Sequence, residues 1–229
     1  MTTSSDAAPG DPDPDLDADA AARGALYALL ASALTHPDET LHRELASGGF
    51  ADRVASYCDR TPVELPTDAL VTDDDYDTLC ARYNDVFVVG FSEYVDPTDG
   101  TKRETEPPVP LYETAYRPNA SWNDVNLDLA RAYDYYDVEV NQEDRDNHDH
   151  LRLELEFAGY LARREAAVDG GDAAAARLDF HDRHLRVLVE GVAERIDDEP
   201  GVGVYGDVVA ALDAFTAADR ADLAARIEG

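Results

Sequence analysis

Two histidines and three acidic residues stand close together in the segment NHDHLRLELEF, residues 147–157. His150 and Glu154 are four residues apart, so a helix places both side chains on one face. A carboxylate and an imidazole at this spacing can help to bind zinc or iron. The same two side chains can instead form a buried polar pair that satisfies itself and holds a helix in place. The segment therefore raises three alternatives: a metal site, an acid–base centre or a structural pair.

The dipeptide His-Asp occurs twice, at His148–Asp149 and at His181–Asp182. It resembles the metal-binding dipeptide of HD-type phosphohydrolases, and a metal-dependent hydrolase is therefore the alternative function. That class needs further spaced ligands, whereas the chain has only six histidines and no HExxH motif. There is also no GxSxG, no GxxxxGK[ST] and no glycine fingerprint after a strand. We therefore expect a binding protein that is not an enzyme, with no catalytic residues and no metal site.

The structural alternative makes a definite prediction for this segment. We expect Asp149 to cap a helix, and His150 and Glu154 to form a buried pair just behind the cap. The residues that follow form two apolar stripes, and a helix that is apolar on so much of its circumference lies at the centre of a bundle. The stripes consist of Leu151, Leu155 and Ala158, and of Leu153, Phe157 and Leu161.

A second informative segment, PPVPLYETAYRP, spans residues 107–118. Its prolines stiffen the backbone, while Leu111, Tyr112 and Tyr116 offer apolar and aromatic surface with polar tips. Glu113 adds one carboxylate. The segment fits a connector whose aromatic side chains simply pack onto the bundle. It equally fits the rigid wall of a groove that binds a partner peptide.

The composition is strongly acidic, with 50 acidic residues against 19 basic ones and a formal net charge of −31. Lys102 is the only lysine, and aspartate outnumbers glutamate by 34 to 16. Because 44% of the residues are hydrophobic, we expect a folded protein adapted to the molar salt of a halophile cytoplasm. At 1 M salt the Debye length of about 3 Å suppresses repulsion between the carboxylates. No basic patch is present, so nucleic acid is excluded as a partner.

Cys58 and Cys80 are 22 residues apart and form no CxxC motif, so neither a disulfide framework nor a zinc ribbon is indicated. The N-terminal residues lack the basic and apolar regions of a signal peptide. The longest nearly apolar run, residues 24–34, is too short to span a bilayer. These features predict a cytoplasmic protein that does not insert into a membrane.

The pattern along the chain predicts an all-α fold, a single-domain bundle of roughly eight to ten helices without strands. Residues 1–17 are rich in Asp, Pro, Ser and Ala and are expected to form a disordered acidic tail before a helical domain at 18–229. Residues 90–121 are expected to form one long loop, which in a compact domain is often functional. The predicted helices span residues 18–34, 37–48, 51–57, 72–87, 122–136, 150–168, 172–196, 206–216 and 218–227.

Together, the two segments resemble the motifs of a known family, the TorD/DmsD/NarJ group of redox-enzyme maturation chaperones. The family pattern P-x-Y-E-[ST]-x-Y is matched by PLYETAY at 110–116, and D-H-x-x-x-E-L-E-F by DHLRLELEF at 149–157. ALYALLASAL at 25–34, RYNDVFVVG at 82–90 and FHDRHL at 180–185 are similar to flanking elements of the family. The resemblance covers about residues 20–217. Asp137 departs from the family pattern where glycine is usual, and such departures leave the subfamily open.

The resemblance implies a TorD-like, cytoplasmic chaperone without catalytic turnover. Such proteins bind the twin-arginine signal peptide, or the N-terminal region, of the apo catalytic subunit of a DMSO-reductase-family molybdoenzyme. They hold it until molybdopterin guanine dinucleotide is inserted, and so prevent premature export. The resemblance implies no permanently bound cofactor. It does imply transient contact with molybdopterin guanine dinucleotide or GTP. The client (a DMSO/TMAO-type, nitrate or other reductase) and the choice between monomer and dimer stay open.

In molar salt, long-range attraction between a basic peptide and the acidic surface is screened within a few ångströms. The groove should therefore be apolar and aromatic, with a few carboxylates for close arginine pairs. The expected partner-binding residues are Pro110, Leu111, Tyr112, Glu113, Tyr116, Asp149, His150, Glu154, Glu156 and Phe157.

Overall fold

The computed structural model describes residues 16–90, 92–96, 101–104, 106–140, 147–167 and 171–228. All but the last two residues of the predicted acidic tail lie outside these ranges, so the tail stays a prediction. Asp17 is the N-cap of the first helix, and its carboxylate accepts hydrogen bonds from the backbone N–H groups of Asp19 and Ala20. A helix therefore begins where the sequence pattern places it.

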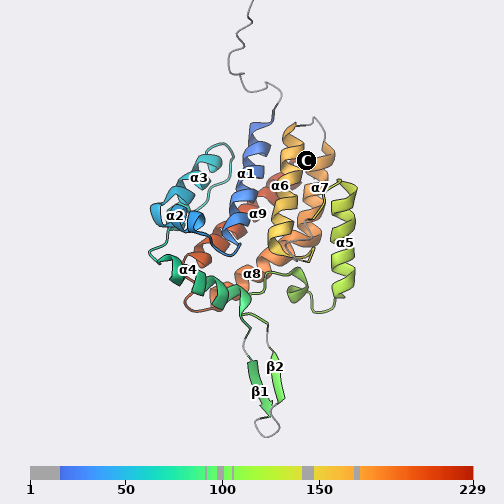
Figure 1. Ribbon diagram of the computed structural model, residues 1–229. Helices are drawn as coiled ribbons and strands as arrows, with labels where there is room; N and C mark the ends of the chain where they lie inside the picture. Colours follow the sequence, from blue (N-terminus) through green and yellow to red (C-terminus); the bar gives the residue numbers. More distant parts are fainter. Residues whose placement is uncertain are drawn as a thin grey trace, which may run out of the picture.

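The described residues form a helical bundle, and the predicted all-α fold class is confirmed for this body (Figure 1). None of the described helices is long and apolar enough to cross a membrane. The α-helices are α1 (Ala18–Ala33), α2 (Glu39–Ser47), α3 (Gly49–Cys58), α4 (Tyr76–Tyr83), α5 (Trp122–Tyr135), α6 (Leu151–Ala167), α7 (Gly171–Phe180), α8 (Arg186–Asp198) and α9 (Val204–Glu228). Two π-helical turns, Asn84–Val88 and His181–Leu185, continue α4 and join α7 to α8.

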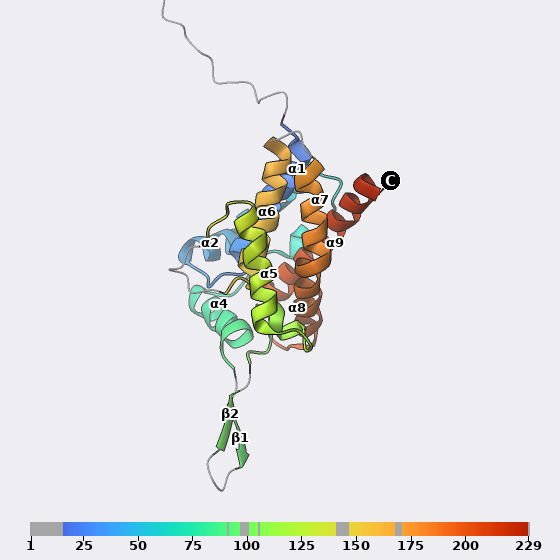
Figure 2. The same cartoon turned by 90° about the vertical axis from the view of Figure 1, so that its right-hand side faces the viewer.

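Helices α1 and α6 form the centre of the bundle. α1 packs along α6 and also contacts α3 and α9, while α6 packs on α7, and α8 packs on α9 (Figures 1 and 2). Gly24 and Gly159 allow the two central helices to approach closely, because a Cβ atom at Gly159 would lie 2.9 Å from the Cβ of Tyr27. All six residues of the two predicted apolar stripes on α6 are buried. The prediction that this helix is central is confirmed.

Three predicted helix boundaries need correction. Residues 206–216 and 218–227 belong to one helix, α9, which continues through the fully buried Thr216; the hydroxyl of this residue donates to the carbonyl of Leu212 (2.9 Å). α4 begins after the N-cap Asp75 and not at Thr72, since Asp75 accepts the hydrogen bond from the N–H of Thr78. α2 begins after the N-cap Asp38, so Pro37 precedes the helix and does not lie in its first turn.

A β-hairpin lies within the segment predicted to be one long loop. Strand β1 (Ser92–Asp96) pairs antiparallel with β2 (Thr101–Glu104), and the hairpin stands away from the bundle (Figures 1 and 2). The chain returns to the bundle where the N–H of Val109 donates to the carbonyl of Val86 (3.0 Å). The prediction of no strands was wrong here because these strands are short and rich in charge, and therefore lack the alternation of a half-buried strand.

Asp137, which follows the end of α5, has a positive backbone φ of 56°. Side chains are strained in this left-handed region by roughly 1–2 kcal/mol, and glycine is not. We expect Asp137→Gly to raise the free energy of unfolding by about 0.5–1 kcal/mol, since glycine's larger chain entropy offsets part of the gain. Urea unfolding in molar KCl measures this effect. Asp137→Val serves as the opposite control, and a glycine variant no more stable than the valine variant would contradict the assignment.

Candidate peptide-binding groove

The two segments singled out in the sequence lie side by side. The N–H of Leu151 donates to the carbonyl of Leu111 (2.8 Å), and the N–H of Glu113 donates to the carbonyl of Asp149 (2.9 Å). Between these bonds, Tyr112 faces His150 as an isolated antiparallel bridge, with ring centroids 4.9 Å apart. Leu111 and Tyr112 are therefore held beside the start of α6 in an extended conformation, directly before the 3-10 turn Glu113–Tyr116.

His150, and not Asp149, caps α6. The Nδ1 atom of His150 accepts a hydrogen bond from the N–H of Arg152 (3.1 Å), which fixes the proton of the neutral ring on Nε2. The Oδ2 atom of Asp149 accepts bonds from the N–H (3.2 Å) and the hydroxyl (2.7 Å) of Thr114. The predicted role of Asp149 as a cap was wrong, because its carboxylate binds residue 114 of the neighbouring segment and not the helix.

The predicted pair of His150 and Glu154 does not form. Glu154 is fully buried, and neither of its carboxyl oxygens has a hydrogen-bond partner. Burial raises the pKa of Glu154 well above its usual range, and the nearby charges of Glu113 and Asp149 raise it further. His150 instead lines the groove, where its Nδ1 atom accepts the bond from Arg152 and its ring makes a T-shaped contact with that of Tyr112.

Glu113 and Tyr116 hold the segment 110–117 against the bundle through buried contacts. Glu113 is fully buried, pairs with Arg117 and lies 2.9 Å from Nδ1 of His184. The hydroxyl of Tyr116 donates to the carbonyl of Pro110 (2.8 Å), and the guanidinium of Arg195 lies 4.9 Å from its ring centroid. Burial raises the pKa of Tyr116 above its usual value. These contacts give both residues a positioning role, and direct contact of either with a partner stays a prediction.

Gly191 on α8 provides the space for the ring of Tyr116. A Cβ atom at this position would lie 2.2 Å from Cδ1 of Tyr116, so Gly191→Ala must displace the ring. We expect the variant to lower the free energy of unfolding by about 1–3 kcal/mol, the usual cost of overpacking. Chemical unfolding measures the loss, and Glu194→Ala, an exposed site on the same helix, serves as control. A change no larger than that of the control would show that the ring is not held there.

A groove with a volume of about 760 Å³ opens beside the paired segments. Its walls come from the end of α4, the segment 106–115, the first turn of α5 and the residues before α6. Trp122 and Val88 are 51% and 55% exposed, which is unusual for large apolar side chains. The lining consists of His36, Tyr83, Asn84, Phe87, Val88, Glu106, Pro107, Pro110, Leu111, Tyr112, Thr114, Ala115, Ala120, Trp122, Asn147 and His150.

The chemistry of the lining is apolar and aromatic. Among the described residues of the lining, Glu106 is the only acidic one, and none is a lysine or an arginine. The volume lies within the range typical of ligand pockets, and aromatic walls with few polar groups suit apolar side chains of a peptide. The groove can therefore accept an extended apolar segment, with one carboxylate for a neighbouring cation.

The ten predicted partner-binding residues divide between different places. Pro110, Leu111, Tyr112 and His150 line the groove. Glu113, Asp149 and Glu154 are buried beneath its wall, and Tyr116 is packed at the end of the segment. Glu156 and Phe157 contribute to a separate cavity of about 350 Å³, lined also by Tyr133 and Arg163.

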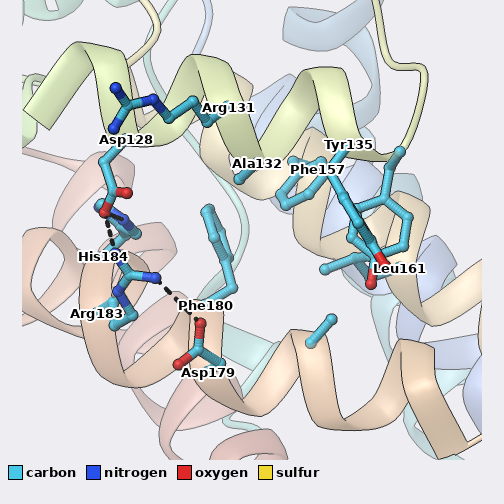
Figure 3. A pocket seen from close by; sticks show the side chains of 12 residues that line it. Asp128, Arg131, Ala132, Tyr135, Phe157, Leu161, Asp179, Phe180, Arg183 and His184 are labelled. Atoms are coloured by element: carbon cyan, nitrogen blue, oxygen red, sulfur yellow. Dashed lines mark hydrogen bonds and ion pairs between the residues drawn. The ribbon is translucent and has the colours of Figure 1, made fainter.

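Phe157 also reaches a third cavity of about 360 Å³, between α5, α6 and α7 (Figure 3). Its floor is formed by Phe157, Leu161 and Phe180, and charged residues lie at its edge. Asp128 there lies 3.1 Å from Nε2 of His184 and also pairs with Arg183. The edge is therefore occupied by side chains that satisfy one another.

Sequence reasoning missed Phe87, Val88 and Trp122 as groove residues. Phe87 and Val88 belong to RYNDVFVVG, which the family resemblance marks as an element but not as a site. Trp122 is the only tryptophan of the chain and stands at a predicted helix start. A large aromatic residue in a polar first turn was the signal that could have found it.

The four residues of the alternative hydrolase site are not brought together. Nε2 of His181 lies 3.1 Å from Asp219 and 2.7 Å from the hydroxyl of Tyr27, while Asp182 pairs with Arg220 (2.6 Å). The ring of His148 lies against Tyr133. Among the described residues, no group of three or more His, Cys, Asp or Glu could hold a metal ion. The hydrolase alternative is not supported.

Comparison with known proteins gives consistent matches. The family model described as "Nitrate reductase delta subunit" matches residues 59–193, which include both paired segments. The chlorate reductase assembly chaperone protein of Ideonella dechloratans is 29% identical over 192 residues, which cover 81% of this chain and 83% of that protein. The selenate reductase assembly chaperone protein of Thauera selenatis is 33% identical over 192 residues with the same coverage. No solved structure matches the chain.

Proposed function

Because the chain belongs to the nitrate reductase delta subunit family, a family of molybdoenzyme maturation chaperones, we propose that it binds the apo catalytic subunit of one such enzyme. The segment it holds is the N-terminal region, including a twin-arginine signal peptide where one is present. Binding lasts until molybdopterin guanine dinucleotide is inserted. The chain then releases the subunit for export or assembly, and so acts in the cytoplasm.

The observation that carries this proposal is the groove, with its aromatic wall and the carboxylate of Glu106. Burying about 400 Å² of apolar surface gives roughly 10 kcal/mol gross at about 25 cal/mol per Å². The costs of association and of ordering the peptide remove a large share of this free energy. Micromolar binding, which needs about 8 kcal/mol, is then within reach without long-range electrostatic attraction.

The relatives bear the names of chlorate and selenate reductase chaperones, and the family model is named for nitrate reductase. We therefore place the client among molybdenum-dependent reductases of oxyanions, with DMSO/TMAO-type reductases as the second choice. Glu106 is the residue we assign to a client arginine, since it is the acidic residue among the groove lining. Transient contact with molybdopterin guanine dinucleotide or GTP belongs to the proposal through the family resemblance alone.

The matched relatives are named as assembly chaperone proteins. The prediction of a binding protein that is not an enzyme is confirmed on this ground. The structure adds a physical reason for a binding role, because the described lining of the groove is mainly apolar and aromatic, with Trp122 and Val88 half exposed.

Deletion of the encoding gene tests the proposal. The catalytic subunit of the client should then accumulate without molybdenum and without reductase activity, while its transcript is unchanged. Molybdenum in the purified subunit is measured by mass spectrometry, and the wild-type gene supplied in trans should restore it. Full molybdenum content in the deletion strain would contradict the proposed function.

A further inference from the structure

Three carboxyl groups lie together directly beneath the groove wall. This wall is the segment 111–114, to which Glu113 belongs. Asp149 precedes α6, and Glu154 lies in the first turns of that helix. Each of the three is 0% exposed. They meet where the backbone of 111–113 pairs with that of 149–151, so their charge acts on the contact that holds the wall in place.

Too few partners surround these carboxyl groups for all three to be ionised. Glu113 has Arg117 and His184, and Asp149 has the N–H and hydroxyl of Thr114 at one oxygen. The second oxygen of Asp149 and both oxygens of Glu154 lack any hydrogen-bond partner. A buried carboxylate without donors or a cation costs several kcal/mol, and such a group takes up a proton instead. Glu154, which has no donor at all, is the group that must do so.

We propose that a proton on Glu154 keeps the groove wall closed: the segment 111–114 docks on α6 while Glu154 is a neutral acid, and loosens when that proton leaves. As an acid, Glu154 can direct its O–H toward the carboxylate of Glu113, which turns a repulsion between helix and segment into an attraction. Once ionised, it faces two further carboxylates without a partner. Leu111 and Tyr112 would then no longer be held in the wall.

The charged and titratable groups around Glu154 agree with this assignment. Glu113 faces it from the segment 111–114, and Arg117 from the end of the 3-10 turn that follows. Asp149 faces it from just before α6 and Tyr133 from α5, while His184 lies behind Glu113. Burial raises the pKa of Glu154, Glu113 and Asp149 raise it further, and Arg117 opposes them. The folded pKa lies above the unfolded value, so docking is at full strength below the usual range of a glutamate and is lost as the pH rises through the raised pKa.

Coupling between protonation of Glu154 and docking of the segment 111–114 can regulate client binding. If a client segment binds the closed wall better than the open one, its binding draws a proton onto Glu154, and proton release favours client release. This consequence rests on the proposed function, whereas the closing of the wall by a proton does not. The two can therefore fail separately.

Amide hydrogen exchange of the wild-type chain in molar KCl tests the device without any client. The N–H groups of Glu113 and Leu151 cross the docked contact, so their protection factors report its opening. Between the ordinary pKa of a glutamate and the raised pKa of Glu154, we expect both factors to fall by about tenfold per pH unit, since one proton is lost on opening, and to level off above the raised pKa. Glu154→Gln, which mimics the neutral acid, should keep them constant. Glu194→Gln, an exposed glutamate on α8, should behave as the wild type.

A second measurement covers the case in which Glu154→Gln does not fold. An infrared titration of the wild-type chain should show the carbonyl stretch of a buried, protonated carboxyl group at neutral pH, lost as the pH rises. Absence of this band would overturn the proposal, as would the same fall in protection in wild type and Glu154→Gln. A chain that shows the band and the fall in protection, yet binds no client, would refute the proposed function and leave the device intact.

Discussion

Asp219→Ala is expected to lower the free energy of unfolding by about 3–5 kcal/mol, because removing one partner leaves buried charges uncompensated. Asp219 on α9 is fully buried and lies 2.7 Å from Nη1 of Arg23. Its other oxygen accepts a bond from the hydroxyl of Tyr27 (2.5 Å) and lies 3.1 Å from His181. Arg177 lies 3.5 Å away and is also fully buried. The carboxylate of Asp219 on α9 thus connects this helix to α1, α7 and the π-helical turn His181–Leu185.

Urea unfolding at neutral pH in molar KCl measures the loss. Asp213→Ala is the matched control on the same helix, since Asp213 pairs with Arg186 but is 39% exposed and should cost no more than about 1 kcal/mol. A loss for Asp219→Ala no larger than that of the control would show that the buried cluster is not a stabilising centre.

The pH dependence of the wild-type stability follows from the pKa of Asp219. Burial alone would raise this pKa, but the hydrogen bond from His181 and the charge of Arg177 outweigh burial and hold it well below its usual range. A depressed folded pKa gives stability that is present above the unfolded value and is lost as the pH falls below it. The wild type should therefore lose more stability below about pH 4 than Asp219→Asn does, relative to neutral pH.

Tyr112→Ala combined with Trp122→Ala is expected to weaken client binding about 100- to 1,000-fold, since truncating each central aromatic residue costs about 2 kcal/mol and the losses are not fully additive. Both side chains line the groove, and Trp122 is half exposed. Stability should fall by no more than about 1–2 kcal/mol, because neither ring lies in the main core. Tyr116→Ala should do the opposite and reduce stability more than binding, since its ring packs on Gly191 and Arg195.

Isothermal titration in molar KCl with a peptide from the N-terminal region of the client measures the affinity. Tyr135→Ala is the matched control, an aromatic residue that is 81% exposed on α5 and lies outside the groove lining. Equal affinity in the double variant and in this control would remove the groove as the binding site. An equal loss of binding and of stability in the double variant would reduce Tyr112 and Trp122 to packing residues.

The helices could largely be predicted from the sequence because their signals are local. The stripes of α6 recur at three- and four-residue spacing, and Asp17, a residue type that favours N-caps, stands directly before α1. The hairpin at 92–104 could not, because its strands are short and rich in charged residues and so lack an apolar alternation. The break predicted near Thr216 failed since the tertiary contacts of α9 override a weak local helix former.

The candidate site could be predicted only in part. The two motifs placed Tyr112 and His150 in one site, and the structure brings them into contact. Which neighbouring side chains point outward depends on the register of residues 111–113 against α6, which spacing alone does not determine. The pair Arg23–Asp219 joins residues 196 positions apart, and the local sequence around either residue does not predict its partner. Such long-range polar contacts come from packing of the whole bundle.

Capture of the tagged chain from cells grown anaerobically in molar salt, followed by mass spectrometry, tests the proposed client binding most directly. The expected result is recovery of the catalytic subunit of one molybdopterin oxidoreductase. Recovery should be lost when the N-terminal region of that subunit is deleted, and equally when Tyr112 and Trp122 are replaced with alanine. Recovery of no such subunit, or of equal amounts with the wild type and the groove variant, would contradict binding of the client in this groove.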